Sequence, residues 1–246
     1  MCTLVLLRRP GHSWPVLVAA NRDEMAGRPW RAPARHWPDR EEVVAGLDER
    51  GGGSWLGVND HGLMAALLNG RDTLGPAPDK RSRGELVLEA LDHADADLAA
   101  EALADLAPDS YRGFHLVLAD NREAFRVSSD ERTITVATVP EGLSVFTEAG
   151  RNELTHPRVA AYLPRFQAAA VPDPDADTWS AWETLLAGRD CDPEAGPEGA
   201  MCVVKNNGFQ TVSSSLMALS ASRQPPAVWR FAPGAPDRTA FCPVLP

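Results

Sequence analysis

The sequence reads VLVAANRDE from Val16 to Glu24, and this stretch decides the fold that we predict. Its first half is apolar at every position, so both faces of a strand over 14–20 should be covered by other layers. Four polar residues then follow without a break. Polar side chains at the end of a buried strand are costly unless they are paired or take part in chemistry.

The start of the chain supplies a candidate nucleophile, Cys2. Removal of Met1 would give Cys2 a free α-amine beside its thiol, and a terminal amine can act as the base for its own side chain. Residues 2–7 read as a strand, and 8–13 have the composition of a turn. We therefore expect the strands over 2–7 and 14–20 to form a hairpin, with Cys2 on rigid structure.

The next part of the chain shows a loop followed by a hairpin. Residues 25–54 look like a long ordered loop that is punctuated by prolines and anchored by tryptophans. The tetrapeptide NDHG at 59–62 is a strong hairpin-turn signal. The return strand over 63–68 ends at Asn69, which makes Asn69 a second polar residue at a strand end.

The remainder of the chain alternates between blocks of strands and blocks of helices. SRGE at 82–85 predicts a capping box in front of a helix that runs to about 92. Hairpin turns join most strands, which favours an α+β fold of antiparallel sheets with segregated helices. We treat 1–246 as one domain with a Pro-rich tail over about 232–246. The other elements that we expect are helices over 97–106, 157–166 and 179–187, and strands over 114–119, 124–128, 133–139, 143–147, 201–205, 209–219 and 228–231.

Composition narrows the functional classes. The net charge is -10 and the pI is about 5.1, which argues against generic binding to nucleic acid or to anionic membranes. The chain has 4 cysteines without a CxxC pair, which is typical of a reduced, cytoplasmic protein. We expect neither a signal peptide nor a transmembrane span, and no metal or cofactor. The oligomeric state stays open.

The chain resembles the NRDE family, also called the transport and Golgi organisation protein 2 family. That family is similar to the N-terminal nucleophile hydrolases, especially the bile-salt hydrolase and penicillin V acylase branch. The resemblance therefore implies a four-layer αββα sandwich of two antiparallel sheets flanked by helices. It covers most of the chain and rests on Met1-Cys2-Thr3, Asn21-Arg22-Asp23-Glu24, Arg28-Pro29-Trp30, Gly53-Ser54-Trp55-Leu56-Gly57, Leu68-Asn69 and Ser82-Arg83-Gly84.

The resemblance also implies an active site. Matched onto this sequence, an N-terminal cysteine is the nucleophile, an Arg and an Asp follow the second strand, and an Asn lines the oxyanion hole. Side chains alternate along a strand, so Asn21 and Asp23 would face one way, and Arg22 the other way together with Glu24. Only one of these pairs can face the nucleophile. The candidate catalytic residues are Cys2, Asn21, Arg22, Asp23 and Asn69.

Two functions fit this resemblance. The first is a cysteine hydrolase that cleaves a non-peptide amide or related acyl bond of a small molecule. The second is a non-catalytic carrier of an apolar ligand, either haem or a lipid acyl group. The related amidases carry a second Asn where this chain has Thr147-Glu148, and an Arg in a late strand where 210–215 has none. These departures favour the carrier, whereas Cys2 and Asn69 favour the hydrolase.

Overall fold

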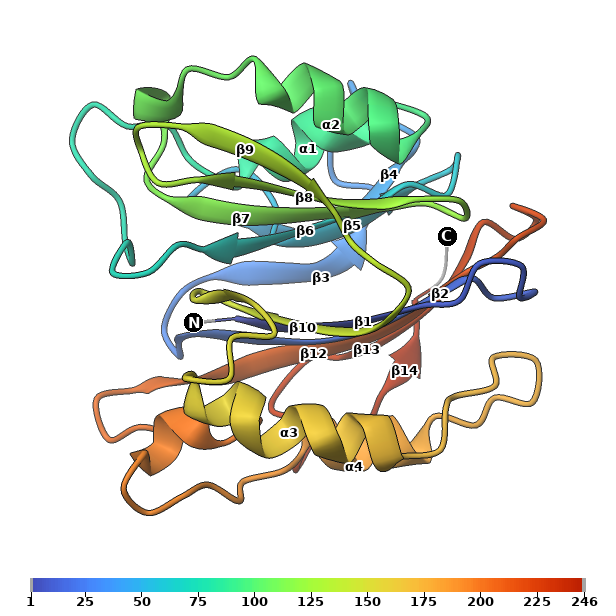
Figure 1. Cartoon of the computed structure of the whole chain (residues 1–246). Helices are drawn as coiled ribbons and strands as arrows, with labels where there is room; N and C mark the ends of the chain where they lie inside the picture. The colour runs from blue at the N-terminus through green and yellow to red at the C-terminus, as the bar shows by residue number, and fades with distance from the viewer. Residues whose placement is uncertain (1, 245–246) are drawn as a thin grey trace.

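The computed structural model describes residues 2–244 and consists of four layers (Figure 1). Two antiparallel seven-stranded sheets stack face to face, and helices cover the outer face of each. The predicted α+β fold with an αββα sandwich is therefore confirmed. The predicted removal of Met1, and the last two residues of the predicted tail, lie outside the described residues.

The first sheet carries the N-terminal hairpin in its middle. Its strand order is β11-β10-β1-β2-β12-β13-β14, so β1, β2 and β12 lie side by side. The bounds of its strands are β1 (Thr3–Arg8), β2 (Val16–Met25), β10 (Gly142–Thr147), β11 (Gly150–Arg151), β12 (Phe209–Leu219), β13 (Ala227–Ala232) and β14 (Cys242–Pro243).

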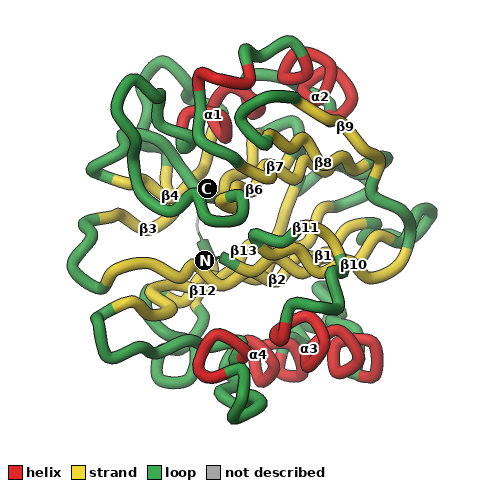
Figure 2. The backbone as a smooth tube through the Cα atoms, turned by 60° about the vertical axis from the view of Figure 1, so that its left-hand side comes forward, coloured by secondary structure: helices red, strands yellow, loops and turns green. Residues whose placement is uncertain are grey.

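The second sheet follows the chain in order, from β3 to β9. Its strands are β3 (Trp30–Ala34), β4 (Val43–Asp48), β5 (Leu56–Asn59), β6 (Met64–Asn69), β7 (Phe114–Ala119), β8 (Ala124–Ser129) and β9 (Ile134–Thr138). Helices cover the outside of both sheets (Figure 2). On the second sheet these are α1 (Glu85–Leu91) and α2 (Ala96–Ala104), and on the first sheet α3 (Pro157–Ala168) and α4 (Ser180–Leu186). Short 3-10 helices are η1 (Pro108–Ser110) and η2 (Gly196–Gly199).

The apolar half of β2 explains how the layers are held together. Val16 and Val18 belong to the core between the two sheets, whereas Leu17 and Ala19 belong to the core under α3 and α4. Each is at most 1% exposed. A strand that packs on both faces needs apolar residues at every position, which is why this stretch lacks alternation. The burial of apolar surface on both sides is the main stabilising term.

Some predicted elements differ from the observed ones. Residues 25–54 form no continuous loop, because β3 and β4 lie within them. β3 is the edge strand of the second sheet, where Pro33 is tolerated because an edge strand does not need every N–H. The predicted capping box is wrong, since the N-cap is Gly84 and no side chain caps the helix. A strand over 201–205 is also wrong, because only a single bridge joins Val204 to Gln210 there.

Within residues 2–244, we find no helix that combines the length and the apolar character needed to cross a membrane.

Candidate active site

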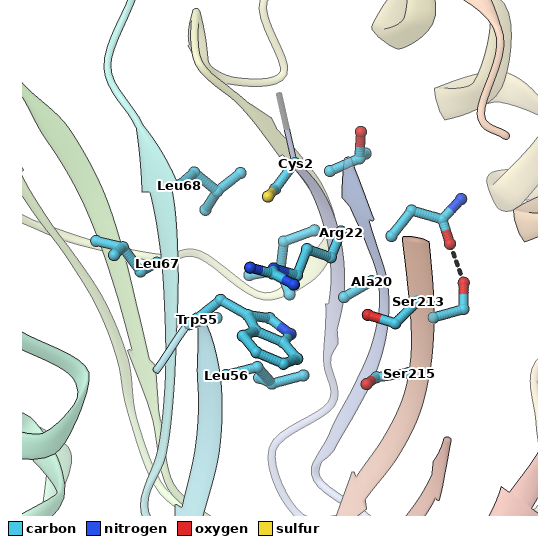
Figure 3. A pocket seen from close by; sticks show the side chains of 14 residues that line it. Cys2, Ala20, Arg22, Trp55, Leu56, Leu67, Leu68, Ser213 and Ser215 are labelled. Atoms are coloured by element: carbon cyan, nitrogen blue, oxygen red, sulfur yellow. Dashed lines mark hydrogen bonds between the residues drawn. The ribbon is translucent and has the colours of Figure 1, made fainter. Parts of the chain in front are cut away.

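The candidate site is a pocket between the two sheets at the start of β1 (Figure 3). It encloses about 330 Å³ of empty space, including its opening to solvent. The first sheet contributes Cys2, Arg22 and Ser213, whereas the second sheet contributes Trp55 and Leu68. One wall is therefore polar and carries a thiol, and the opposite wall is apolar.

Strand register settles which half of the motif faces Cys2. Thr3 pairs with Asn21 in the β1–β2 hairpin, and paired residues of antiparallel strands share a face. The side chains of Thr3, Asn21 and Asp23 accordingly point to the helix layer, and Arg22 points into the pocket with Cys2. The Asn21 and Asp23 side chains thus lie on the opposite face of the strand from Arg22, although the Asp23 carboxylate is near enough to raise the pKa of the Cys2 thiol. Arg22 shares the pocket with the thiol.

Arg22 is a buried cation that is only partly paired. Its Nη2 donates to Asp48 Oδ2 at 2.9 Å, and its guanidinium lies 4.1 Å from the centroid of the Trp55 ring. Its Nη1 is buried and has no hydrogen-bond partner among residues 2–244. Burial lowers the pKa of Arg22 from its ordinary value, although the nearby Cys2 and Asp48 favour the charged form. A buried, unpaired N–H aimed into a pocket is available for an oxygen atom of a ligand.

Asp48 holds the Arg22 guanidinium in place. Besides Arg22, it binds Arg28 with both oxygens, with Nε–Oδ2 at 2.6 Å and Nη2–Oδ1 at 3.0 Å. The backbone N–H of Gly51 also donates to Asp48 Oδ1 at 2.9 Å. Burial alone would raise the pKa of Asp48, but these hydrogen bonds and charges outweigh burial and lower the pKa. Asp48 therefore stays ionised and holds Arg22 in one position.

The Cys2 thiol is not activated by its surroundings alone. Burial raises the pKa of the thiol above its ordinary value, although the backbone N–H of Asp23 and the charge of Arg22 act in the opposite direction. The thiol is therefore protonated at neutral pH. A nucleophilic role requires a base close to the sulfur.

Ser213 enters the pocket because β12 contains a β-bulge. Thr211 pairs with Asp23 and Ser213 pairs with Arg22, so the register shifts by one residue between them. The bulge puts Thr211 on the helix side and Ser213 on the pocket side, although strict alternation would give them the same face. Like Arg22 Nη1, the Ser213 hydroxyl is buried and has no hydrogen-bond partner in the part of the chain that the structure describes.

The helix side of the same strands holds a paired polar network. Asp23 Oδ1 accepts from Thr211 Oγ1 at 2.6 Å, and its Oδ2 accepts from Arg158 Nη1 at 3.1 Å. Arg158 comes from α3, is 1% exposed and also donates to Thr3 Oγ1. Asn21 Nδ2 donates to two backbone carbonyls, and its Oδ1 accepts from the Ser214 hydroxyl. This network ties the N-terminal hairpin to α3 and α4.

Asn69 lies at the end of β6, where it pairs with Phe114 of β7. Its neighbour Leu68 packs in the core between the sheets and lines the pocket. Alternation along β6 points the Asn69 side chain toward the other face of the second sheet. The pocket lining stops at Leu68, so the structure does not bring the Asn69 amide into it. A role of Asn69 in an oxyanion hole stays a prediction.

The Ser82-Arg83-Gly84 stretch supports the loop that precedes Trp55. Ser54 N donates to Gly84 O at 2.9 Å, and a Cβ on Gly53 would lie 2.2 Å from the carbonyl carbon of Gly84. Only glycine permits that approach. Arg83 donates to Thr73 Oγ1 at 2.9 Å and to the carbonyl oxygen of Gly113 at 2.8 Å. These residues therefore position the apolar wall of the pocket.

Sequence reasoning missed the residues that support Cys2 and Arg22. Asp48 lay in a stretch that we expected to be a loop, and Arg158 lay in a helix with an apolar face. The run of serines at 213–215 in a buried strand was a usable signal, because buried hydroxyls need a reason. Among residues 2–244, no group of His, Cys, Asp or Glu side chains comes together in a way that could hold a metal ion.

Sequence comparison with known proteins shows which family this chain resembles. The model of the family described as Transport and Golgi organisation 2 matches residues 1–170. The Transport and Golgi organization protein 2 homolog of Bos taurus is 40% identical over 114 residues, which are 44% of this chain and 40% of that relative. The match thus spans less than half the length of the curated relative.

Comparison with solved structures shows which known proteins have a similar fold. The Caenorhabditis elegans orthologue of N-acylethanolamine-hydrolyzing acid amidase matches with a TM-score of 0.58 and 13% identity, over 88% of this chain and 92% of that chain. Penicillin V acylase from Agrobacterium tumefaciens matches with a TM-score of 0.52 and 14% identity, over 95% of this chain and 83% of that chain. At such identities the likeness shows the fold alone, which is that of the N-terminal nucleophile hydrolases.

Proposed function

This chain belongs to the Transport and Golgi organisation 2 family, and from that premise we propose that it is a cysteine N-terminal nucleophile hydrolase. Its substrate is a small molecule with a non-peptide amide or a related acyl bond. One observation carries the proposal: the Cys2 thiol shares a pocket with Arg22, whose buried Nη1 has no partner in the described part of the chain. That pairing supplies a nucleophile and an unused hydrogen-bond donor for a substrate oxygen.

The reaction begins once Met1 has been removed. The α-amine of Cys2 has an ordinary pKa of about 7.7–8.0, so near neutral pH it can accept the proton of the thiol. Such a base is needed because burial raises the pKa of the thiol. Asp23, whose carboxylate is fixed by Arg158 and Thr211, holds the amine in position.

The thiolate sulfur then attacks the carbonyl carbon, and the carbonyl oxygen becomes an oxyanion. Arg22 Nη1 and the Ser213 hydroxyl, which have no partner among the described residues, stabilise that oxygen. The C–N bond breaks as the Cys2 ammonium gives its proton to the leaving amine, which leaves an acyl thioester on the sulfur. Water, deprotonated by the same amine, attacks the thioester and releases the carboxylic acid and the thiol.

The apolar wall supports an apolar acyl group in the substrate. Trp55, Leu56 and Leu68 face the thiol across the pocket, and burying apolar groups against them is favourable. The names of the two solved structures above describe enzymes that act on acylated small molecules. We propose the same broad class of substrate for this chain. Since all four cysteines are free, we propose a reducing compartment such as the cytoplasm.

A panel of acylated amides and thioesters, assayed by product mass, tests this function. We expect turnover by the wild-type protein and a loss of at least about a thousandfold in Cys2→Ala. Cys242→Ala is the matched control, because this exposed cysteine lies on β14, at the edge of the sheet. Equal rates in wild type and Cys2→Ala would exclude Cys2. Saturable haem or fatty-acyl binding that survives Cys2→Ala, without turnover, would favour the carrier instead.

A further inference from the structure

A second cleft opens at the side of the sandwich, where the edges of the two sheets meet. The chain passes from β9, the last strand of the second sheet, directly to β10 of the first sheet (Figure 1). The cleft encloses about 610 Å³ of empty space, including its open mouth. Arg126 from β8 and Arg151 from β11 line opposite sides of it, with 137–139 between them. Each sheet therefore contributes one arginine.

Both arginines point toward the gap between the sheets. Arg126 lies two residues after Ala124, whose side chain is in the core between the sheets. Arg151 pairs with Phe146, which is in the same core. The Arg126 guanidinium also reaches the chain just before Arg151, since a Cβ on Gly150 would lie 3.3 Å from Arg126 Nη1.

Neither of the two arginines has a carboxylate partner within residues 2–244. Arg151 donates from Nη1 to the Ser144 hydroxyl at 3.2 Å, and the buried Nε of Arg126 has no hydrogen-bond partner in the same range. Burial, followed by repulsion from Arg151, lowers the pKa of Arg126. Arg22 and Arg158, by contrast, are buried and each bind an aspartate.

Among the described residues, Arg126 and Arg151 lack an acidic partner in a protein that is rich in acids. The chain has 34 acidic and 24 basic residues, so acidic partners are abundant. A third cation adds to the positive field, because the Arg8 guanidinium donates to the backbone oxygen of Val139, which lines the cleft, at 3.5 Å. Two like charges that share a cleft without an anion repel each other, and a bound anion would remove that repulsion.

We propose that this cleft binds a small phosphorylated ligand through its phosphate group, with Arg126 and Arg151 as the phosphate-binding residues. A phosphate monoester carries a charge between about −1.5 and −2 at pH 7, which balances two guanidiniums. Its oxygens can accept from both arginines at once, and guanidinium is the side-chain group best matched to phosphate. The site is separate from the Cys2 pocket and does not depend on hydrolase activity.

Titration calorimetry with inorganic phosphate at constant ionic strength tests the site. We expect one saturable site on the wild-type protein, with a Kd on the order of 1 mM, and the same binding in Cys2→Ala. Arg126→Gln and Arg151→Gln should each weaken binding at least about tenfold. Arg132→Gln is the matched control, because Arg132 is exposed in the turn between β8 and β9 and should bind phosphate as the wild type does.

Thermal unfolding provides the second measurement. Phosphate should raise the melting temperature of the wild type and of Arg132→Gln, but not that of Arg126→Gln or Arg151→Gln. Arg151 is exposed, so its substitution should leave the fold intact even if that of Arg126 does not. Unchanged phosphate affinity in Arg151→Gln, or the absence of any saturable binding to the wild type, would overturn the proposal.

Discussion

The two faces of β1, β2 and β12 carry polar side chains from the same short stretches, yet they are paired very differently. On the helix side, Asn21, Asp23 and Thr211 form hydrogen bonds, and these hydrogen bonds are buried. On the pocket side, Arg22 Nη1 and Ser213 Oγ are buried without partners. The difference teaches that strand alternation can divide one motif, so that one half is hydrogen-bonded within the fold and the other half lines a pocket.

The first and largest expected effect concerns the paired face. Arg158→Ala removes the cation from a buried ion pair with Asp23, which should lower the free energy of unfolding by about 3–5 kcal/mol. Urea denaturation monitored by circular dichroism measures this. Arg165→Ala on the same helix is the control, since that side chain is 44% exposed, and it should change stability by less than about 0.5 kcal/mol. Similar losses in both variants would mean that the helix face is not what stabilises the hairpin.

The second prediction concerns the unpaired face. Arg22→Ala removes a donor that points into the pocket, so kcat on an identified substrate should fall by about 10²–10³-fold. Arg28→Ala is the matched comparison, because Arg28 binds the same Asp48 but does not line the pocket. Its kcat should stay within about tenfold of the wild type. If both variants lose the same activity, Arg22 acts through Asp48 and does not contact the substrate.

A third prediction compares two hydroxyls on β12 directly. Thr211→Val deletes a hydrogen bond to a buried carboxylate and should cost about 1.5–3 kcal/mol of stability. Ser213→Ala deletes a buried hydroxyl that has no partner, so stability should stay the same or rise by up to about 1 kcal/mol. Chemical denaturation of the two variants measures the contrast. A larger loss for Ser213→Ala than for Thr211→Val would reverse the assignment of the two faces.

The smallest expected effect concerns pH. The pKa of Asp48 is lowered in the folded protein, so the stability that it contributes is present above its unfolded pKa of about 3.9 and is lost as the pH falls through the folded value. The stability difference between wild type and Asp48→Asn should therefore shrink below about pH 4. Thermal unfolding of both proteins between pH 3 and pH 7 checks this. A constant difference over that range would show that Asp48 is not ionised in the fold.

Much of this arrangement could be predicted from the sequence. The two-faced apolar run before Asn21 predicts an inner strand with layers on both sides, and Cys2 on a neighbouring strand follows from the turn composition at 8–13. The alternation of side chains along a strand predicts that Arg22 and Asp23 point to opposite faces of the sheet. Which of them faces Cys2 depends on the register between strands, and that register is a tertiary property.

The parts that could not be predicted depend on contacts between distant segments. The bulge that moves Ser213 into the pocket adds one residue to β12 and leaves no local signature. The partner of Asp23 comes from α3, 135 residues along the chain. β3 could not be recognised in the sequence because Pro33 argues against a strand. A proline is tolerated at the edge of a sheet, but the edge position of β3 is known only from the structure.

The central claim is that Cys2 becomes an N-terminal nucleophile on the unpaired face. Intact mass spectrometry of the purified protein, followed by peptide mapping after a rapid acid quench during turnover of an acyl substrate, tests it most directly. We predict that Met1 is absent and that the acyl mass is on the peptide that begins with Cys2. Retention of Met1, or an acyl mass on Cys191, Cys202 or Cys242 instead, would contradict the claim.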